Sequence, residues 1–183
     1  MARFIPTLPS DRKHLPLIVV LVVALAVVVT VFYVLNTAAK VDGDSMLPGL
    51  RNGDRVLITR GYRTPRRGDI VSFAAVIGGQ PDTLIKRVVA LAGDVVEVNG
   101  DSIRINGAPE PGGHQVLKGA EAFHIEPLTV PAGSVYVLGD NRAVSLDSRF
   151  FGPVALKNVK GKAVYLFSPI NRFRRIDAAS GRP

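Results

Sequence analysis

Two residues in the first half of the chain are of types that together can carry out nucleophilic catalysis. Ser45 lies in the segment Gly43–Leu50 (GDSMLPGL), and Lys86 interrupts an otherwise apolar strand pattern. A serine hydroxyl needs a base before it attacks a carbonyl carbon, and a lysine amine serves as that base once it is neutral near pH 7. Burial against apolar side chains such as Leu84 and Val88 disfavours the ammonium form and lowers the pKa of the lysine. The pair therefore predicts the serine–lysine form of the nucleophile–base arrangement.

A third polar segment, Gly139–Gly152 (GDNRAVSLDSRFFG), brings charged and hydroxyl side chains together. In it, Ser145 is a short hydroxyl that can orient the Lys86 amine without adding charge. The two aspartates and two arginines near it are expected to lock the loop by ion pairing and not to react: Asp140, Arg142, Asp147 and Arg149. Taken singly, the three segments are compatible with a turn, a lysine whose amine reaches solvent, and a salt-bridged loop. Together they favour a catalytic site.

The composition excludes several other kinds of site. The 183 residues contain no cysteine, so a disulfide framework, a thiolate metal site and a cysteine nucleophile are all excluded. Only three histidines are present, so a multi-histidine metal site is not expected. Neither His114 nor His124 has neighbours that suggest a catalytic base. With 47% hydrophobic and 21% charged residues, the chain does not have the composition of a disordered protein.

The segment Leu17–Leu35 (LIVVLVVALAVVVTVFYVL) has the length and composition of a membrane-spanning helix. It carries no charge, and as a helix it extends roughly 28 Å, close to the roughly 30 Å hydrocarbon thickness of a bilayer. A cleavable secretory signal is the alternative, and Thr37–Ala39 would suit its cleavage site. The apolar core of such a signal is typically about 7–15 residues, however. We therefore expect a retained transmembrane anchor over residues 15–36.

The charges around this segment predict its orientation. Three basic residues and one acid precede it: Arg3, Arg12, Lys13 and Asp11. Because positive residues favour the cytosolic side, residues 1–14 are expected to be a cytosolic stub of a single-pass protein in the cell membrane. The rest of the chain would then be extracytoplasmic. Most of the net charge of +8 lies in this outer part, which predicts contact with anionic membrane lipids and no binding of nucleic acid.

After the anchor the sequence predicts a mainly β domain over residues 37–170, barrel-like or built as a folded sheet. Short segments rich in β-branched residues alternate with turn residues; they are Arg55–Thr59, Asp69–Ala75, Thr83–Leu91, Val95–Val98, Ile103–Ile105, Ser134–Leu138 and Ala163–Phe167. Asn99-Gly100-Asp101 predicts a hairpin turn between two of them. The Gly- and Pro-containing stretch Gly107–Pro131 is interpreted as an excursion between strands. Residues 171–183 are predicted to be a frayed basic tail.

The order of three motifs resembles that of type I signal peptidases, the membrane-bound S26 serine endopeptidases. The motifs are Ser-Met-x-Pro at Ser45, Lys-Arg-Val at Lys86, and Gly-Asp-Asn-Arg-x-x-Ser-x-Asp-Ser-Arg-x-x-Gly from Gly139, and the resemblance extends from Val41 to about Pro169. It implies a signal-peptidase-like β catalytic domain behind one N-terminal transmembrane helix. The implied activity is removal of signal peptides from exported preproteins, without a metal or cofactor.

The resemblance also assigns roles to residues of this chain. It makes Ser45 the nucleophile and Lys86 the general base. The supporting residues, which orient the lysine or hold the loop, would be Ser145, Asp147, Arg149, Asp140 and Arg142.

Two positions depart from the pattern of the family. Many members have threonine where this chain has Gly49, and in some a serine that donates a hydrogen bond to the oxyanion stands where this chain has Gly43. The oxyanion would then depend on the Ser45 backbone N–H and one further donor. An extended substrate is expected to pair with strand edges near the nucleophile and near Asp82–Ile85. The residues expected to bind it are Asp42, Gly43, Asp44, Met46 and Ile85, with Met46 and Ile85 as walls of shallow pockets for small side chains.

Other functions are compatible with some of these features. A specialised processing peptidase for pilins or conjugation components would use the same Ser45–Lys86 pair. A self-cleaving repressor of the LexA type shares the Ser-Met turn, but the anchor, the lack of a DNA-binding helical domain and the long third motif argue against it. A non-catalytic, membrane-tethered β binding domain would make both residues incidental. Signal peptide cleavage is the interpretation that accounts for all three motifs.

Overall fold

The structure is a computed structural model that describes residues 15–100, 102–110 and 124–177. The chain divides into two compact units, Met1–Leu35 and Asn36–Pro183. In the first, α1 (Leu15–Leu35) is continuous over the apolar segment and is long and apolar enough to cross a membrane. The helix predicted from the sequence is therefore present. The cytosolic stub expected over residues 1–14 lies outside the described residues.

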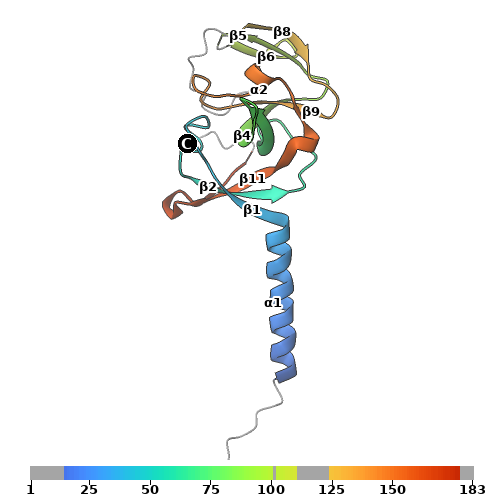
Figure 1. Cartoon of the computed structure of the whole chain (residues 1–183), viewed down its shortest axis with the longest axis vertical. Coiled ribbons are helices and arrows are strands. Elements are labelled where there is room, and N and C mark those ends of the chain that lie inside the picture. Colours follow the sequence, from blue (N-terminus) through green and yellow to red (C-terminus); the bar gives the residue numbers. More distant parts are fainter. Residues whose placement is uncertain (1–14, 101, 111–123, 178–183) are drawn as a thin grey trace, which may run out of the picture. The chain divides into compact units, whose positions relative to one another are not determined.

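The second unit consists of two antiparallel sheets joined by β4 and β5 along the chain (Figure 1). The larger has the order β1-β2-β11-β3-β4-β9-β10, with β12 paired to β11. Its strands are β1 (Asn36–Lys40), β2 (Arg55–Arg60), β3 (Ile70–Ile77), β4 (Gln80–Leu91), β9 (Ser134–Leu138), β10 (Val154–Ala155), β11 (Val159–Ser168) and β12 (Arg174–Arg175). Short helical turns are α2 (Ser148–Phe151), η1 (Leu156–Asn158) and η2 (Ile170–Arg172).

The smaller sheet has the order β7-β6-β5-β8 and forms a separate layer in Figure 1. Its strands are β5 (Val95–Asn99), β6 (Ser102–Ile105), β7 (Ala108–Pro109) and β8 (His124–Thr129). The hairpin predicted at Asn99-Gly100 joins β5 to β6, and Gly100 has a positive φ of 58°. The stretch interpreted as an excursion contributes β7 and β8 to this sheet, and its central part, 111–123, lies outside the described residues. The mainly β fold predicted from the sequence is confirmed.

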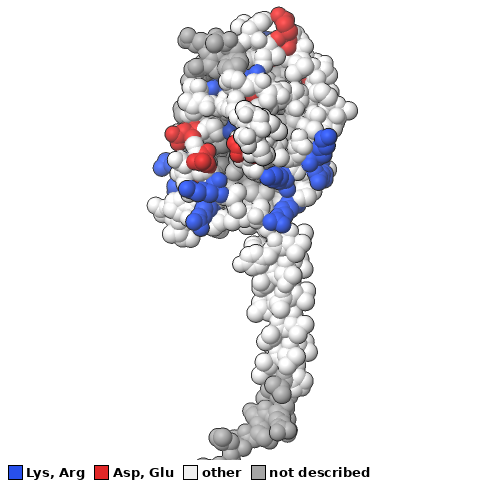
Figure 2. All heavy atoms as spheres, viewed as in Figure 1, with Lys and Arg blue, Asp and Glu red and all other residues white. Residues whose placement is uncertain are grey.

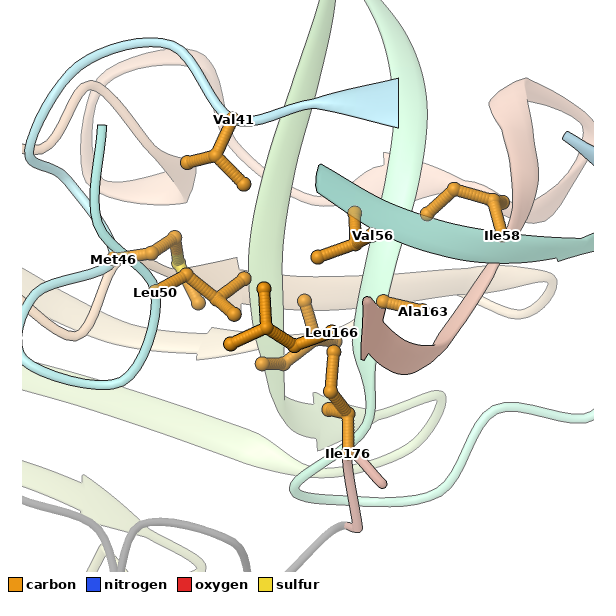
Figure 3. Close-up of a cluster of buried hydrophobic side chains, with 9 residues drawn as sticks. Val41, Met46, Leu50, Val56, Ile58, Ala163, Leu166 and Ile176 are labelled. Carbon is orange, nitrogen blue, oxygen red and sulfur yellow. The ribbon is translucent and has the colours of Figure 1, made fainter. Parts of the chain in front are cut away.

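One hydrophobic cluster joins the turn that carries Ser45 to the large sheet (Figure 3). Its members come from the β1–β2 connection, β2, β3, β11 and the C-terminal segment: Val41, Met46, Leu50, Val56, Ile58, Ile70, Ala163, Leu166 and Ile176. Met46 is 0% exposed, which contradicts its expected place in the wall of a substrate pocket. The reason is packing: Met46 belongs to this cluster, whereas the neighbouring Ser45 is only half-buried.

The C-terminal segment differs from the frayed tail predicted from Asn171. Residues 170–172 form η2, Arg174–Arg175 form β12, and the Ile176 side chain is buried in the cluster just described. The amide of Ile176 also donates to the carbonyl oxygen of Val164 at 2.8 Å. The basic composition of the segment concealed the apolar side chains that attach it, Ile176 in the cluster and Phe173, whose ring stacks on Tyr165. Residues 178–183 lie outside the described residues.

Candidate active site

The Ser45 hydroxyl and the Lys86 amine are in direct contact. Lys86 Nζ donates to Ser45 Oγ at 2.7 Å and to the backbone carbonyl oxygen of Ile85 at 3.1 Å. Ser45 belongs to the turn between β1 and β2, whereas Lys86 belongs to β4 and lies 41 residues further along the chain. The fold therefore brings the expected nucleophile and the expected base within the distance that proton transfer requires.

Lys86 is almost completely removed from solvent, with 4% of its surface exposed. The inner half of β4 lies between β3 and β9, and apolar clusters cover both faces of this part of the sheet. Burial lowers the pKa of Lys86 from 10.5 to about 8. Three carboxylates oppose this shift because they favour the charged amine, those of Asp147, Asp140 and Asp82. Desolvation outweighs them, so a neutral amine is accessible at mildly alkaline pH.

The third polar segment is attached to the nucleophile through the backbone. The amide of Asn141 donates to the Ser45 carbonyl oxygen at 3.0 Å. Beside this bond, Gly139 leaves no room for a side chain: a Cβ there would overlap the Ser145 hydroxyl and lie 2.5 Å from the Ser45 carbonyl oxygen. A glycine at position 139 is therefore required for this segment to approach the nucleophile so closely.

Ser145 does not make the contact with Lys86 that the sequence led us to expect. Its Oγ is buried and has no hydrogen-bond partner among the described residues. The reason is geometric, because the hydroxyl is confined against Gly139 while the amine donates to Ser45 and Ile85. The direct orienting bond is therefore absent from the structure.

The ion pair expected between Asp147 and Arg149 is present and buried. Arg149 Nε donates to Asp147 Oδ1 at 2.8 Å, and Arg149 Nη2 donates to the carbonyl oxygen of Arg142 at the same distance. Asp147 also caps α2 through the Arg149 amide and accepts from the Gly139 amide at 3.0 Å. These bonds fold the segment back on itself and hold Gly139 beside the nucleophile.

Asp140 and Arg142 also pair as expected, but with residues outside their own segment. Asp140 forms a two-pronged pair with Arg87, with Nε–Oδ1 and Nη2–Oδ2 distances of 2.8 and 2.7 Å. Arg87 is 1% exposed and is the neighbour of Lys86 on β4. Arg142 donates to the Gly139 carbonyl oxygen at 2.8 Å and to both carboxylate oxygens of Glu110 at 2.9 Å. The segment is thus tied to β4 and to the smaller sheet.

The backbone conformation explains why position 43 is a glycine and not a serine. Its φ is +77°, in the region that L side chains rarely adopt, so a serine hydroxyl could be placed there only with strain. The Ser45 amide makes no hydrogen bond to another described residue. It is therefore a donor available to an oxyanion.

Three of the expected substrate-binding residues differ in their exposure. Asp42 and Asp44, on either side of Gly43, are exposed, whereas Ile85 is half-buried. Around Ile85, the outer half of β4 pairs with β3 on one edge only, because pairing with β9 begins at Arg87. Among the described strands, the other edge of Asp82–Ile85 has no partner.

The family model described as signal peptidase, peptidase S26, matches residues 14–168. The chain belongs to this family. It is 38% identical over 144 residues to a signal peptidase I from Leptolyngbya laminosa, covering 74% of this chain and 70% of that protein. It is 35% identical over 176 residues to a signal peptidase I from Bacillus licheniformis, covering 87% and 90%. A crystal structure of a signal peptidase I from Enterococcus faecalis is 31% identical, covers 56% of this chain and 98% of that one, and superposes with a TM-score of 0.43.

The chain is therefore a membrane-bound peptidase that cleaves signal peptides. In this signal peptidase, two contacts were not predicted from the sequence. One is the ion pair of Arg87 with Asp140, and the other is the hydrogen bond from the Asn141 amide to the Ser45 carbonyl oxygen. Alternation along β4 puts Lys86 and Arg87 on opposite faces of the sheet, yet both are buried because the strand is central. The signal for Arg87 was its place next to the base and the unmatched acid at Asp140.

Proposed function

We propose that Ser45 and Lys86 are the catalytic pair with which this signal peptidase hydrolyses the peptide bond after a signal peptide. The observation that carries the proposal is the 2.7 Å contact between Ser45 Oγ and a buried amine whose pKa is lowered to about 8. The neutral amine accepts the hydroxyl proton as Oγ attacks the scissile carbonyl carbon. The resulting ammonium then donates that proton to the leaving amine, and an acyl-enzyme ester at Ser45 remains.

The second half of the reaction uses the same groups. After the mature protein leaves, water takes its place, and the amine of Lys86 removes a proton from it as it attacks the ester. The Ser45 amide donates to the oxyanion in both steps. No carboxylate reacts, because Asp140 and Asp147 are committed to Arg87 and Arg149.

The unpartnered edge of β4 supports a binding mode for the substrate. An extended segment of a preprotein adds as a strand beside Asp82–Ile85, which leads directly to Lys86. The half-buried Ile85 then contacts a small side chain before the cleavage site. Asp42, Gly43 and Asp44 border the nucleophile on the other side, and Met46 contributes only through the core.

The sequence and the surface charge support a location and orientation. The anchor keeps the chain in the cell membrane with residues 1–14 cytosolic and the domain that begins at Asn36 outside, where signal peptides emerge. Ser45 follows the anchor by only ten residues, which keeps it near the membrane surface. Figure 2 shows Lys and Arg side chains gathered over the region of β1, β2 and β11, a charge suited to anionic lipid headgroups.

The test uses purified full-length protein in detergent and a preprotein with an Ala-x-Ala cleavage site. Ser45→Ala and Lys86→Ala should each abolish cleavage. Two matched controls, Ser102→Ala and Lys157→Ala, change exposed residues of the same types and should cleave like wild type. Equal cleavage by all five proteins, or none by wild type, would refute the proposal. Cleavage confined to pilin-type substrates would favour a specialised processing peptidase instead.

A further inference from the structure

The segment after β11 contributes two arginines to the turn that carries Ser45. It begins at Pro169, just beyond the residues matched by the family model, and contains η2 and β12. Arg174 Nη2 donates to the carbonyl oxygen of Gly49 at 2.6 Å, and Arg172 Nη2 donates to the same oxygen at 3.2 Å. Two guanidinium groups thus meet one carbonyl oxygen four residues after the nucleophile.

Arg172 also connects this carbonyl to a buried acid. Its Nη1 lies 2.6 and 2.7 Å from the two carboxylate oxygens of Asp54, at the end of the same turn. Asp54 additionally accepts from the Arg51 amide at 2.8 Å. The arginine therefore spans the turn from Gly49 to Asp54 and holds both ends of its second half.

Other bonds hold the rest of the turn, and the Gly49 carbonyl is a further point of attachment. The Leu50 amide donates to the Met46 carbonyl oxygen at 2.9 Å, and both of these side chains lie in the cluster that also contains Ile176 (Figure 3). On the other side, Asn141 holds the Ser45 carbonyl. The arginines hold the carbonyl of Gly49, and Asp140 Oδ2 would lie 3.5 Å from a Cβ at this residue.

Placing these two arginines here costs free energy, because a charged group is partly desolvated and two like charges lie close together. Burial lowers the pKa of Arg174, and the nearby charge of Arg172 lowers it further. A like-charged pair converging on one neutral oxygen is retained only if the position of that oxygen matters, or if the carboxylate of Asp54 offsets the repulsion fully. A fall in kcat when the arginines are removed would favour the first explanation, and an unchanged kcat would favour the second.

We propose that Arg172 and Arg174 are positioning residues for the nucleophile. By holding the Gly49 carbonyl they fix the turn, and with it the Ser45 hydroxyl and amide relative to Lys86 Nζ. They touch neither the substrate nor the reacting atoms. The inference rests on the proposed role of Ser45 and extends the active site to a segment that lies beyond the match to the family.

The experiment compares full-length wild type with Arg172→Ala, Arg174→Ala and the double variant, using the preprotein cleavage assay. Arg175→Ala is the matched control, because Arg175 lies on the same strand but is exposed and pairs with Asp177 at the surface. For each protein, kcat per folded molecule, KM and the pH dependence of kcat are measured. The folded fraction is taken from the thermal unfolding curve.

We expect kcat to fall about 10- to 100-fold in Arg174→Ala and in the double variant, because small displacements of a reacting group cost about this much. KM should change less than twofold, and the midpoint of the pH profile should stay that of wild type, because neither arginine adjoins Lys86. Arg174→Lys, which keeps one donor, should recover part of the loss. Arg175→Ala should match wild type.

Three results would overturn the inference: wild-type kcat in the folded double variant, a rise in KM in place of the fall in kcat, or a shifted pH midpoint. If Arg174→Ala does not fold, Arg174→Met, which keeps an apolar stem but has no hydrogen-bond donor, replaces it, and an unchanged kcat there refutes the inference. Ser45→Ala is run in parallel. If Ser45→Ala is inactive and the arginine variants are fully active, only this inference fails; if Ser45→Ala cleaves normally, the proposed function fails and this inference with it.

Discussion

Lys86 is the residue at which the fold and the chemistry make opposing demands. Its amine is buried at 4% exposure, which costs free energy while it is charged, yet burial is what makes the amine a usable base. Three carboxylates lie close enough to oppose the loss of charge, but two of them, Asp140 and Asp147, are paired with buried arginines. This pairing limits how far the acids can restore the charge of Lys86. The geometry of the supporting ion pairs therefore protects the function of the base.

The pH dependence of cleavage should report this amine. With the pKa of Lys86 lowered to about 8, the amine is protonated below pH 8 and neutral above it. We therefore expect kcat/KM to rise with pH through a midpoint near 8 and then to level off, because only the neutral amine accepts the Ser45 proton. Measuring cleavage from pH 6 to 10 tests this. A flat profile would contradict the assignment of Lys86 as base.

The same shift predicts that the base destabilises the protein at neutral pH. Between the folded pKa of about 8 and the ordinary value of 10.5, the unfolded chain binds more protons, so stability rises with pH over this range. Wild type should gain about 2 kcal/mol between pH 8 and pH 9.5, and Lys86→Met, which fills similar space without charge, should not. Denaturant unfolding at both pH values measures the difference. Lys86→Met should also be inactive and, at pH 7, more stable than wild type; lower stability at pH 7 would contradict the argument.

At the scale of elements, the site is a junction of three segments that are distant in sequence. β4 carries the proposed base, the β1–β2 turn carries the proposed nucleophile, and Gly139–Gly152 is bonded to the turn through the Asn141 amide. The third segment contributes no reacting group. The ion pairs of its charged side chains hold the three segments together, and Gly139 allows the close approach to Ser45.

Gly139→Ala should separate these segments. A Cβ at position 139 would collide with both Ser145 and the Ser45 carbonyl oxygen, and neither the Cβ of Ser145 nor this backbone oxygen can move away by a side-chain rotation. We expect cleavage to fall at least about 10²-fold with folding largely retained, because the nucleophile is displaced.

Gly49→Ala is the matched control for this substitution. A Cβ at Gly49 would meet its nearest neighbour, Asp140 Oδ2, at an ordinary 3.5 Å, and its φ is not positive. Cleavage should therefore be close to wild type, and stability should rise by about 0.4–1 kcal/mol because the unfolded chain loses freedom. Kinetics and unfolding of both variants provide the test. Equal activities of the two glycine variants would show that close approach at Gly139 is not needed.

The sequence predicted those parts of the site that depend on local pattern. The β-rich domain, the apolar helix and the Ser45–Lys86 contact follow from periodicity and from motifs. Side-chain direction in irregular backbone does not, so Met46 was placed in a pocket and Ser145 on the amine. The arginines of the C-terminal segment look like a tail in the sequence because they share a backbone carbonyl as partner and because the acid that pairs with Arg172, Asp54, is 118 residues away along the chain. Pairing between distant segments, such as that of Arg87 with Asp140, could not be predicted from the sequence either.

At the scale of the whole molecule, the catalytic pair is useful only on the side of the membrane where signal peptides emerge. β1 begins at Asn36, directly after the last residue of α1 at Leu35, so the peptidase fold follows the anchor immediately along the chain. The anchor therefore limits how far the active site can travel from the bilayer. This confinement reduces the entropy that is lost when a membrane-borne substrate binds.

The proposed orientation can be tested by labelling with a membrane-impermeant maleimide, because the chain has no cysteine of its own. A single cysteine at the exposed position 76, introduced as Val76→Cys, should react in intact cells, since this strand end lies in the outer domain. The matched variant Ser10→Cys should react only after the membrane is permeabilised, because the positive charges around it favour the cytosol. Labelling of Ser10→Cys and not of Val76→Cys in intact cells would reverse the orientation. It would also place Ser45 and Lys86 on the side where no emerging cleavage site can reach them.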